Sequence, residues 1–205
     1  MPITINGNGT IAGLAVGGLP DGSVDADTLA SNAVTSAKLA SGAITSSELP
    51  TGTVVQVVQG TFTGTNNTTG TGLVDTGITK SITVTGSNKV LVSYTCYMSA
   101  AAGVYGVRTV LVRGSSQIFL GDQPSTGMRA TGGGWTNNSL GDYTTWNHSN
   151  TFLDTPGAGT HTYKIQFSST YTGSNQARVG RPIGGTSNSA YYTTPSHITL
   201  MEIAA

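Results

Sequence analysis

Charge is scarce in this sequence. Only 9% of the 205 residues are Asp, Glu, Lys or Arg, and nine basic residues balance nine acidic ones. An average globular protein has about 25%. A neutral chain lacks the basic surface that phosphate backbones require, so we expect no nucleic-acid partner. Cysteine is nearly absent too: a single Cys96 excludes an intramolecular disulfide and any paired-cysteine zinc or redox site.

Long apolar runs and helix-forming residues are also missing. No stretch approaches the ~20 apolar residues that span a bilayer, so we expect no membrane insertion. The start MPITINGNGT lacks the basic and apolar regions of a signal peptide. The chain is instead rich in small and hydroxyl residues, with 34 Thr, 29 Gly, 21 Ser and 12 Asn. Much Thr and Gly with little Lys, Glu or Leu disfavours helices and predicts an all-β protein.

The first fifty residues contain a ten-residue repeat, called here the decad repeat (residues 11–50). Written in tens, it reads IAGLAVGGLP, DGSVDADTLA, SNAVTSAKLA and SGAITSSELP. The fourth position of each ten is apolar and the ninth is leucine. These residues are Leu14, Leu19, Val24, Leu29, Val34, Leu39, Ile44 and Leu49.

The spacing of these apolar residues matches neither a helix nor a strand. Asp25, Thr35 and Thr45 follow the apolar fourth residue and are good N-caps. Each ten is therefore predicted to form an extended step and one capped helical turn. A single chain has no second layer to cover its apolar side chains. We expect three parallel chains to form a trimeric shaft from the repeat, and the alternative is a disordered, low-complexity linker.

From Thr51 onward, short alternating segments separated by turn residues predict an antiparallel β-sandwich of about eight to ten strands. In 90–98 (VLVSYTCYM), Cys96 lies on the more apolar face, so we expect a buried, inert thiol. The last strand is apolar on both faces, which predicts a core contact on one face and a neighbouring subunit on the other. Strands are expected at 53–59, 73–78, 80–85, 90–98, 104–113, 116–120, 150–153, 161–168 and 197–203.

Several segments resemble fibre proteins of tailed bacteriophages, notably marine and cyanobacterial ones. At the N-terminus these are TINGNGTIAGL and GGLPDGSVDADTLASNAVTSAKLASGAIT. TFLDTPGAGTHTYKIQF and HITLMEIAA resemble the terminal sandwich domain of such fibres, which is similar to the trimeric jelly rolls of C1q and tumour necrosis factor. The resemblance implies a homotrimeric virion fibre with a jelly-roll-like C-terminal knob (residues 51–205). Residues 1–20 would attach the fibre to other virion proteins.

The resemblance leaves the position of the fibre on the virion open. A tail fibre would point its knob outward and bind a polysaccharide of the host surface. The alternative is a capsid or collar fibre with a mainly architectural role. There the first residues matter most, because an extended Gly- and Asn-rich segment can add to the edge of a partner's sheet. The expected attachment residues are Ile3, Ile5 and Ile11.

One loop has the composition of a sugar site. Residues 129–148, RATGGGWTNNSLGDYTTWNH, hold both tryptophans of the chain among amide and carboxylate side chains. Aromatic rings pack on sugar C–H groups, while amides and carboxylates orient hydroxyls. The alternative is that the tryptophans fill the core or a subunit interface. The loop at 172–195 is a second candidate surface. The predicted binding residues are Arg129, Trp135, Asn137, Asp142, Tyr143, Trp146 and Asn147.

No catalytic constellation is visible in the sequence. The histidines lie far apart, and the acids of the C-terminal region form no local pair of the kind that glycoside hydrolysis needs. The Gly-rich segment 131–134 lacks the lysine of a phosphate loop and is interpreted as a flexible turn. We therefore expect no enzymatic activity, cofactor or metal, with a glycan hydrolase as a remote alternative. The residues considered are His148, His161, His197, Asp75, Asp122, Asp142, Asp154 and Glu202.

Overall fold

The structure is a computed structural model of the whole chain. It describes residues 4–5, 11–12, 24, 27, 29–101, 106–135, 144–173, 177–184 and 192–205. The chain divides into two compact units, Met1–Thr45 and Ser46–Ala205. The second unit thus begins slightly before the knob predicted at 51–205. Among the described residues, no helix is long and apolar enough to cross a membrane.

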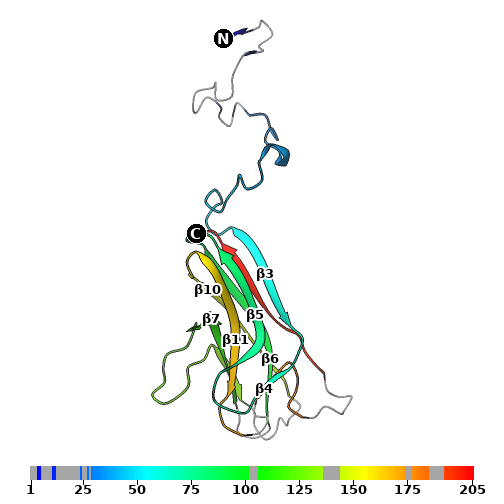
Figure 1. Cartoon of the computed structure of the whole chain (residues 1–205), viewed down its shortest axis with the longest axis vertical. Coiled ribbons are helices and arrows are strands. Elements are labelled where there is room, and N and C mark those ends of the chain that lie inside the picture. Colours follow the sequence, from blue (N-terminus) through cyan, green and yellow to red (C-terminus); the bar gives the residue numbers. More distant parts are fainter. Residues whose placement is uncertain are drawn as a thin grey trace. The chain divides into compact units, whose positions relative to one another are not determined.

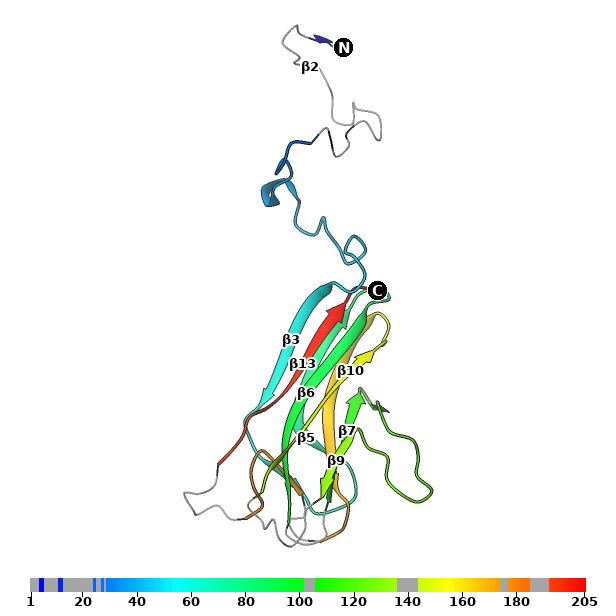
Figure 2. The same cartoon turned by 180° about the vertical axis from the view of Figure 1, so that it is seen from behind.

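The second unit consists of two antiparallel sheets that pack on one core as a β-sandwich, as predicted (Figures 1 and 2). The strands of the first sheet are β3 (Val54–Phe62), β4 (Asn66–Thr68), β6 (Lys89–Ala100), β10 (Trp146–Asp154), β12 (Ala177–Val179) and β13 (Ser196–Ile203). Those of the second are β5 (Val74–Val84), β7 (Gly106–Arg113), β8 (Ser116–Ile118), β9 (Gly132–Trp135) and β11 (Gly159–Ser169). The first sheet has the order β3-β13-β6-β12-β4, with β10 also paired to β6. The second has the order β5-β11-β7-β8, with β9 also paired to β7.

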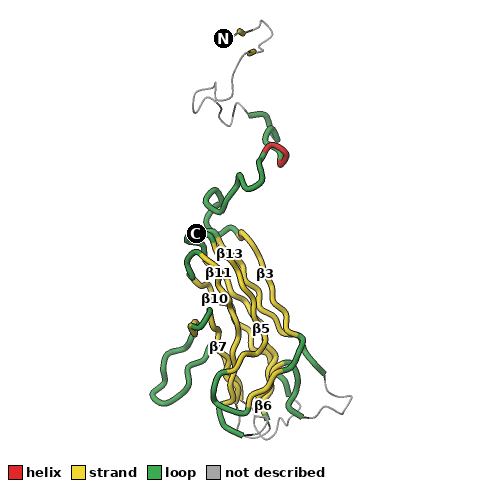
Figure 3. The backbone as a smooth tube through the Cα atoms, in the orientation of Figure 1, coloured by secondary structure: helices red, strands yellow, loops and turns green. Residues whose placement is uncertain are grey.

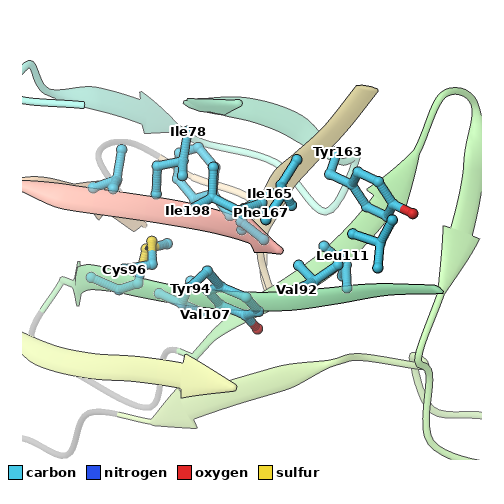
Figure 4. Close-up of a cluster of buried hydrophobic side chains, with 14 of the residues drawn as sticks. Ile78, Val92, Tyr94, Cys96, Val107, Leu111, Tyr163, Ile165, Phe167 and Ile198 are labelled. Carbon is cyan, nitrogen blue, oxygen red and sulfur yellow. The ribbon is translucent and has the colours of Figure 1, made fainter. Parts of the chain in front are cut away.

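Alternating side chains from both sheets form the core (Figure 4). In β6, Val92, Tyr94 and Cys96 are fully buried, while the residues between them lie on the half-buried outer face. In β11, Ile165 and Phe167 are buried in the same way. Complete burial of an apolar side chain stabilises a fold by about 1.5–3 kcal/mol. The period-two pattern of β6 and β11 therefore predicts correctly which of their side chains face the core.

Cys96 lies in the middle of this core. Its side chain is fully buried, and its thiol contacts Met98 Sδ at 3.0 Å. Burial raises the pKa of the Cys96 thiol to about 12, because the thiolate would be desolvated. The prediction of a buried, unreactive thiol is confirmed.

The predicted break between strands 73–78 and 80–85 is wrong, because these residues form the single strand β5. Gly77 lies inside it with a φ of 96°, and the pairing register with β11 shifts between Lys164 and Gln166. A residue with a Cβ at Gly77 would collide with the ring of Phe62. Glycine therefore serves here as a bulge within one strand and not as a turn.

Three short strands are absent from the prediction. β4, β9 and β12 have only three or four residues, too few for a period-two pattern to be visible. β9 corrects the interpretation of 131–134 as a flexible turn, since residues 132–135 pair with β7. β10 begins at Trp146, so the C-terminal end of the predicted 129–148 loop is part of the sheet.

In the described residues 29–53, backbone turns recur with the ten-residue period of the sequence. Turns close at 30–33, 40–43 and 50–53, with N···O distances of 2.9, 3.0 and 3.1 Å. The third residue of each turn has a positive φ, as in a type II turn. These residues are Asn32 (63°), Gly42 (78°) and Gly52 (90°). Glycine and asparagine adopt this conformation at the least cost, so the residue type at these three positions has a structural reason.

The helical turn predicted within each ten is found in the third one. A 3₁₀ helix, η1, covers Ser36–Lys38 and follows the extended Thr35. The predicted side-chain cap is wrong here, because the Thr35 hydroxyl makes no capping hydrogen bond. Lys38 Nζ instead donates to the Ala33 carbonyl at 2.7 Å, which links the helical turn to the preceding β-turn.

The apolar residues of the repeat remain accessible in a single chain. Val34 is 56% exposed and Leu39 is 44% exposed. Val24, Leu29 and Ile44 are similarly exposed, and Leu49 is half-buried. Leu14 and Leu19 lie outside the described residues.

The first twenty residues include a short two-stranded ribbon. β1 (Thr4–Ile5) pairs antiparallel with β2 (Ile11–Ala12), and Ile5 lies opposite Ile11. Two of the three predicted attachment residues therefore share one two-stranded ribbon, and Ile3 lies outside the described residues.

Candidate functional site

Two short strands share one edge of β7. β8 pairs with residues 111–113 and β9 with residues 106–109. The loop at 119–131 joins these strands and projects beside β7 (Figures 2 and 3). Thr131 closes the edge between them, because its amide donates to the Thr109 carbonyl at 2.8 Å and its hydroxyl accepts from the Leu111 amide at 2.9 Å.

Hydrogen bonds within the loop hold its shape. The Gly121 amide donates to the Ala130 carbonyl at 3.1 Å, and Arg129 Nε donates to the Gly121 carbonyl at 2.8 Å. Gln123 Nε2 donates to the Gly127 carbonyl at 2.8 Å across the tip. Arg129 is a predicted binding residue, and its side chain here supports the base of the loop.

A pocket of about 380 Å³ lies between this loop, β7, β9 and the residues after β11. Small-molecule sites have similar volumes. Its walls include Met128, Trp135 and Tyr171, which are 43%, 57% and 49% exposed. The rings of Trp135 and Tyr171 meet edge to face, with centroids 6.2 Å apart and an interplanar angle of 79°. This edge pocket therefore offers accessible aromatic faces on a rigid sheet.

The second tryptophan has a different environment. Trp146 is half-buried and packs against the core, directly behind Gly134, where a Cβ would collide with its indole nitrogen. Trp146 Nε1 donates to His148 Nε2 at 2.7 Å. Burial lowers the pKa of His148 to about 4, so the imidazole is neutral at pH 7 and can accept this bond. These contacts give Trp146 a structural role behind the strand that carries Trp135.

Within the part of the chain that the structure describes, Arg108 is the one charged residue that lines the edge pocket. Its guanidinium donates to Ser168 Oγ at 2.8 Å, to the Arg129 carbonyl at 3.1 Å and to the Thr71 carbonyl at 3.5 Å. All three acceptors are neutral. Partial burial lowers the pKa of Arg108 by desolvation, but an arginine stays charged at neutral pH. No ion pair involves Arg108 among the residues that the structure describes.

Asp75 and Asp154, two of the acids considered for catalysis, form ion pairs, and a third, Asp122, is exposed in the 119–131 loop. Asp154 Oδ2 accepts from Arg113 Nη1 and from the Tyr163 hydroxyl, each at 2.7 Å. Desolvation and the hydrogen bond to Asp154 raise the pKa of Tyr163 above its usual range. Asp75 forms an ion pair with Lys164 at 2.9 Å. None of these acids lines the edge pocket.

Glu202 is almost fully buried in β13. Its carboxylate accepts from Gln56 Nε2 at 2.6 Å and from Thr85 N and Asn88 Nδ2, each at 2.8 Å. Burial raises the pKa of this carboxyl, but the hydrogen bonds outweigh burial and the pKa lies below its ordinary value. Glu202 thus joins β13 to the start of β3 and to the turn between β5 and β6.

The remaining predicted residues are dispersed. Asn147 is exposed on β10 and accepts a hydrogen bond from Ser149 Oγ at 2.6 Å. Asn137, Asp142 and Tyr143 lie outside the described residues. Trp135 is the one predicted binding residue that lines the edge pocket among the described residues.

Sequence reasoning missed three residues of the pocket, namely Arg108, Met128 and Tyr171. A weak signal existed for Arg108, which is a cation in the interior of the mostly apolar strand β7, whereas Arg113 stands at the end of that strand. Tyr171 and Met128 carry no local pattern, because they reach the pocket through strand pairing and loop closure.

The outer face of the six-stranded sheet carries an apolar row across four strands. Met201 lies opposite both Val57 and Leu91, and Leu91 lies opposite Leu153. Val57 is 54% exposed and Leu153 is 47% exposed. The neighbouring row is polar and contains Gln59, Thr199, Ser93 and Thr151. The apolar residues, called here the outer row, lie at the end of the sheet where the chain enters β3.

No protein-family model matches this sequence, and no curated protein matches it. Among the described residues, no three His, Cys, Asp or Glu side chains gather as a metal site would require.

Proposed function

We propose that this chain is a structural fibre protein of a bacteriophage virion, a homotrimeric tail fibre whose sandwich knob binds a host cell-surface glycan. The observation that carries the proposal is the decad repeat. Its turns recur every ten residues, while its apolar side chains stay about half exposed in one chain. A regular backbone with a periodic apolar face is the arrangement that parallel copies can cover.

The sandwich supports the trimer at a second place. The outer row gives the sheet an apolar strip beside a polar one, and exposed apolar patches with polar borders are typical of protein interfaces. Met201 and Ile203 of the last strand are half-buried on this face, while Ile198 and Leu200 are buried on the other. The strand order also fits a jelly roll, in which two sheets of antiparallel strands wind around each other.

Glycan binding is supported by the edge pocket. Trp135 and Tyr171 expose aromatic faces on a rigid sheet edge, and such faces stack on the C–H surface of sugars. Three knobs per fibre and many fibres per particle would turn weak individual binding into avidity. Asp75, Asp154 and Glu202 are held by lysine, arginine or amide partners, and no acid lines the pocket among the described residues, so we propose binding without hydrolysis or a cofactor.

The oligomeric state tests the shaft. In sedimentation equilibrium the full chain should have three times its monomer mass of 20.8 kDa. The double substitution Leu39→Asp and Leu49→Asp should dissociate the trimer, because it places charges at the interface of the repeat. The matched control is Ser41→Asp, which adds a charge at an exposed position of the same repeat. A monomeric wild-type chain would overturn the proposal.

Cryo-electron microscopy of intact particles tests the location. Density on tail fibres with the sandwich outward is the expected result, and loss of cell adsorption in Trp135→Ala would then follow. Density on the capsid or collar would replace receptor binding with an architectural role and make the ribbon of β1 and β2 the functional segment.

A further inference from the structure

The edge pocket combines a cation with accessible aromatic rings. Trp135 and Tyr171 supply the rings and Met128 an apolar wall. Arg108 is the only charged residue among the described residues that line it. The described wall of the pocket therefore carries a positive charge and no acidic side chain.

The hydrogen bonds of Arg108 to the described residues leave part of its guanidinium unused. An arginine has five N–H donors, and Arg108 makes two short bonds and one long one, all to neutral oxygens. The bond from Nε to Ser168 Oγ at 2.8 Å and the bond from Nη1 to the Arg129 carbonyl at 3.1 Å hold the plane of the group. A fixed guanidinium with free donors is suited to a carboxylate, which accepts charge-assisted hydrogen bonds.

We propose that the edge pocket binds an acidic sugar, a pyranose whose carboxylate meets Arg108 while its ring packs on Trp135 and Tyr171. The inference rests on the proposed glycan-binding function and adds the chemical class of the ligand. The 119–131 loop closes one side of the site, and Arg129 positions that loop through the Gly121 carbonyl. A neutral sugar would stack on Trp135 and Tyr171 in the same way, but it would offer no negative charge to the Arg108 guanidinium.

Paired sugar probes test the proposal on the full chain. The probes are trisaccharides of glucuronate, galacturonate and mannuronate, each compared with its carboxyl-reduced neutral form by isothermal titration calorimetry. At low salt, at least one acidic probe should bind about tenfold more tightly than its neutral form, because charge-assisted hydrogen bonds are roughly twice as strong as neutral ones. Added salt should weaken the acidic probe selectively, since screening acts on the charge.

Three variants locate the interaction. Arg108→Gln should reduce the preference for the acidic probe to about onefold, because it removes the charge and keeps a donor for Ser168. Lys89→Gln makes the same change in net charge on β6, away from the pocket, and should keep the preference. Trp135→Ala should abolish binding of both forms. The wild-type comparison and its salt dependence test the proposal even if Arg108→Gln fails to fold.

The outcomes separate this inference from the function on which it rests. Equal affinity for acidic and neutral forms, or a preference that Lys89→Gln removes as strongly as Arg108→Gln does, overturns the acidic-sugar inference and leaves glycan binding in place. Failure of every probe to bind the wild-type chain at millimolar concentration overturns both.

Discussion

The sandwich buries its apolar core residues within one chain, whereas the decad repeat leaves its described apolar residues accessible. Leu200 in the sandwich is fully buried by residues of the same chain, whereas Leu39 in the repeat is 44% exposed. The two leucines have the same chemistry and differ in what surrounds them. A sandwich covers each sheet with the other one, but a single row of turns has no second layer. One chain of the sandwich thus covers its own core, whereas the described apolar residues of the repeat stay accessible in a single chain.

Several ionisable side chains are likewise buried in the sandwich, whereas those described in the repeat are exposed. In the sandwich, Glu202, Asp154 and His148 are buried and hydrogen-bonded to specific partners. In the repeat, Asp27 and Lys38 are exposed. A change of pH should therefore act on the stability of the sandwich through His148 and Glu202, whose pKa values are lowered in the folded chain.

Matched leucine substitutions give the largest expected contrast. Leu200→Ala should lower the free energy of unfolding of the sandwich by about 2–5 kcal/mol, because it leaves a cavity in the core. Leu39→Ala should leave this free energy unchanged and weaken the oligomer. Both tryptophans lie in the sandwich, so urea unfolding followed by tryptophan fluorescence measures the first effect, and sedimentation measures the second.

Leu153→Ala is the control for that contrast, since Leu153 is in the sandwich and exposed in the single chain. It should cost the sandwich much less than Leu200→Ala. An equal loss of sandwich stability in Leu39→Ala and Leu200→Ala would mean that the repeat is part of the sandwich core, and the comparison would fail.

Acid should destabilise the sandwich in two steps. His148 binds a proton at its ordinary pKa of 6.5 when unfolded, but only at about 4 when folded. The unfolded state therefore binds more protons as the pH falls from 6.5 to 4, and stability decreases by about 2 kcal/mol over this window. His148→Gln should flatten this slope in urea unfolding measured at a series of pH values.

Glu202→Gln is the matched variant for the second step. The folded pKa of Glu202 lies below its ordinary value of 4.5, so its stabilisation is present above pH 4.5 and is lost as the pH falls through the folded value. This variant should keep the slope between pH 6.5 and 4.5, where His148 binds its proton, and lose the further decrease in stability below pH 4.5. If His148→Gln leaves the slope above pH 5 unchanged, another group accounts for the first step.

The turns of the repeat provide the smallest expected effect. Gly42 has a φ of 78°, and a Cβ there would meet no atom within 4 Å. Gly42→Ala should therefore cost only the left-handed backbone conformation, about 1–2 kcal/mol per chain. The cost should lower the melting temperature of the shaft, followed by circular dichroism, and leave the fluorescence transition of the sandwich in place.

Asn32→Gly is the reciprocal variant, because it places glycine where the same turn holds a non-glycine residue at a φ of 63°. It should be neutral or slightly stabilising for the shaft. A shaft that melts identically in Gly42→Ala and wild type would show that these turns do not persist in the assembly.

Strands in which apolar and polar residues alternate regularly could be predicted from the sequence. Short strands and the bulged strand β5 could not be predicted correctly. β6 and β11 alternate over enough residues to place both faces, including the burial of Cys96 and Phe167. β9 has four residues, three of them glycine, and glycine carries no apolar signal. The reason for these glycines lies elsewhere in the chain, since Gly134 makes room for Trp146.

The candidate site could be predicted in part. Its composition pointed to residues 129–148, and Trp135 is indeed exposed there. The sequence has no means to separate Trp135 from Trp146, because their exposure depends on how β9 of one sheet packs beside β10 of the other. Arg108 and Tyr171 join the pocket from β7 and from the end of β11, which strand pairing places beside β9.

The sequence by itself determined the all-β class, the ten-residue period and the faces of the long strands. These depend on local periodicity, which is written in consecutive residues. The tertiary structure alone decided which tryptophan is exposed, which acids are buried and which cation faces the pocket. Burial and charge pairing depend on residues far apart in the chain, and these become neighbours only when the two sheets pack together.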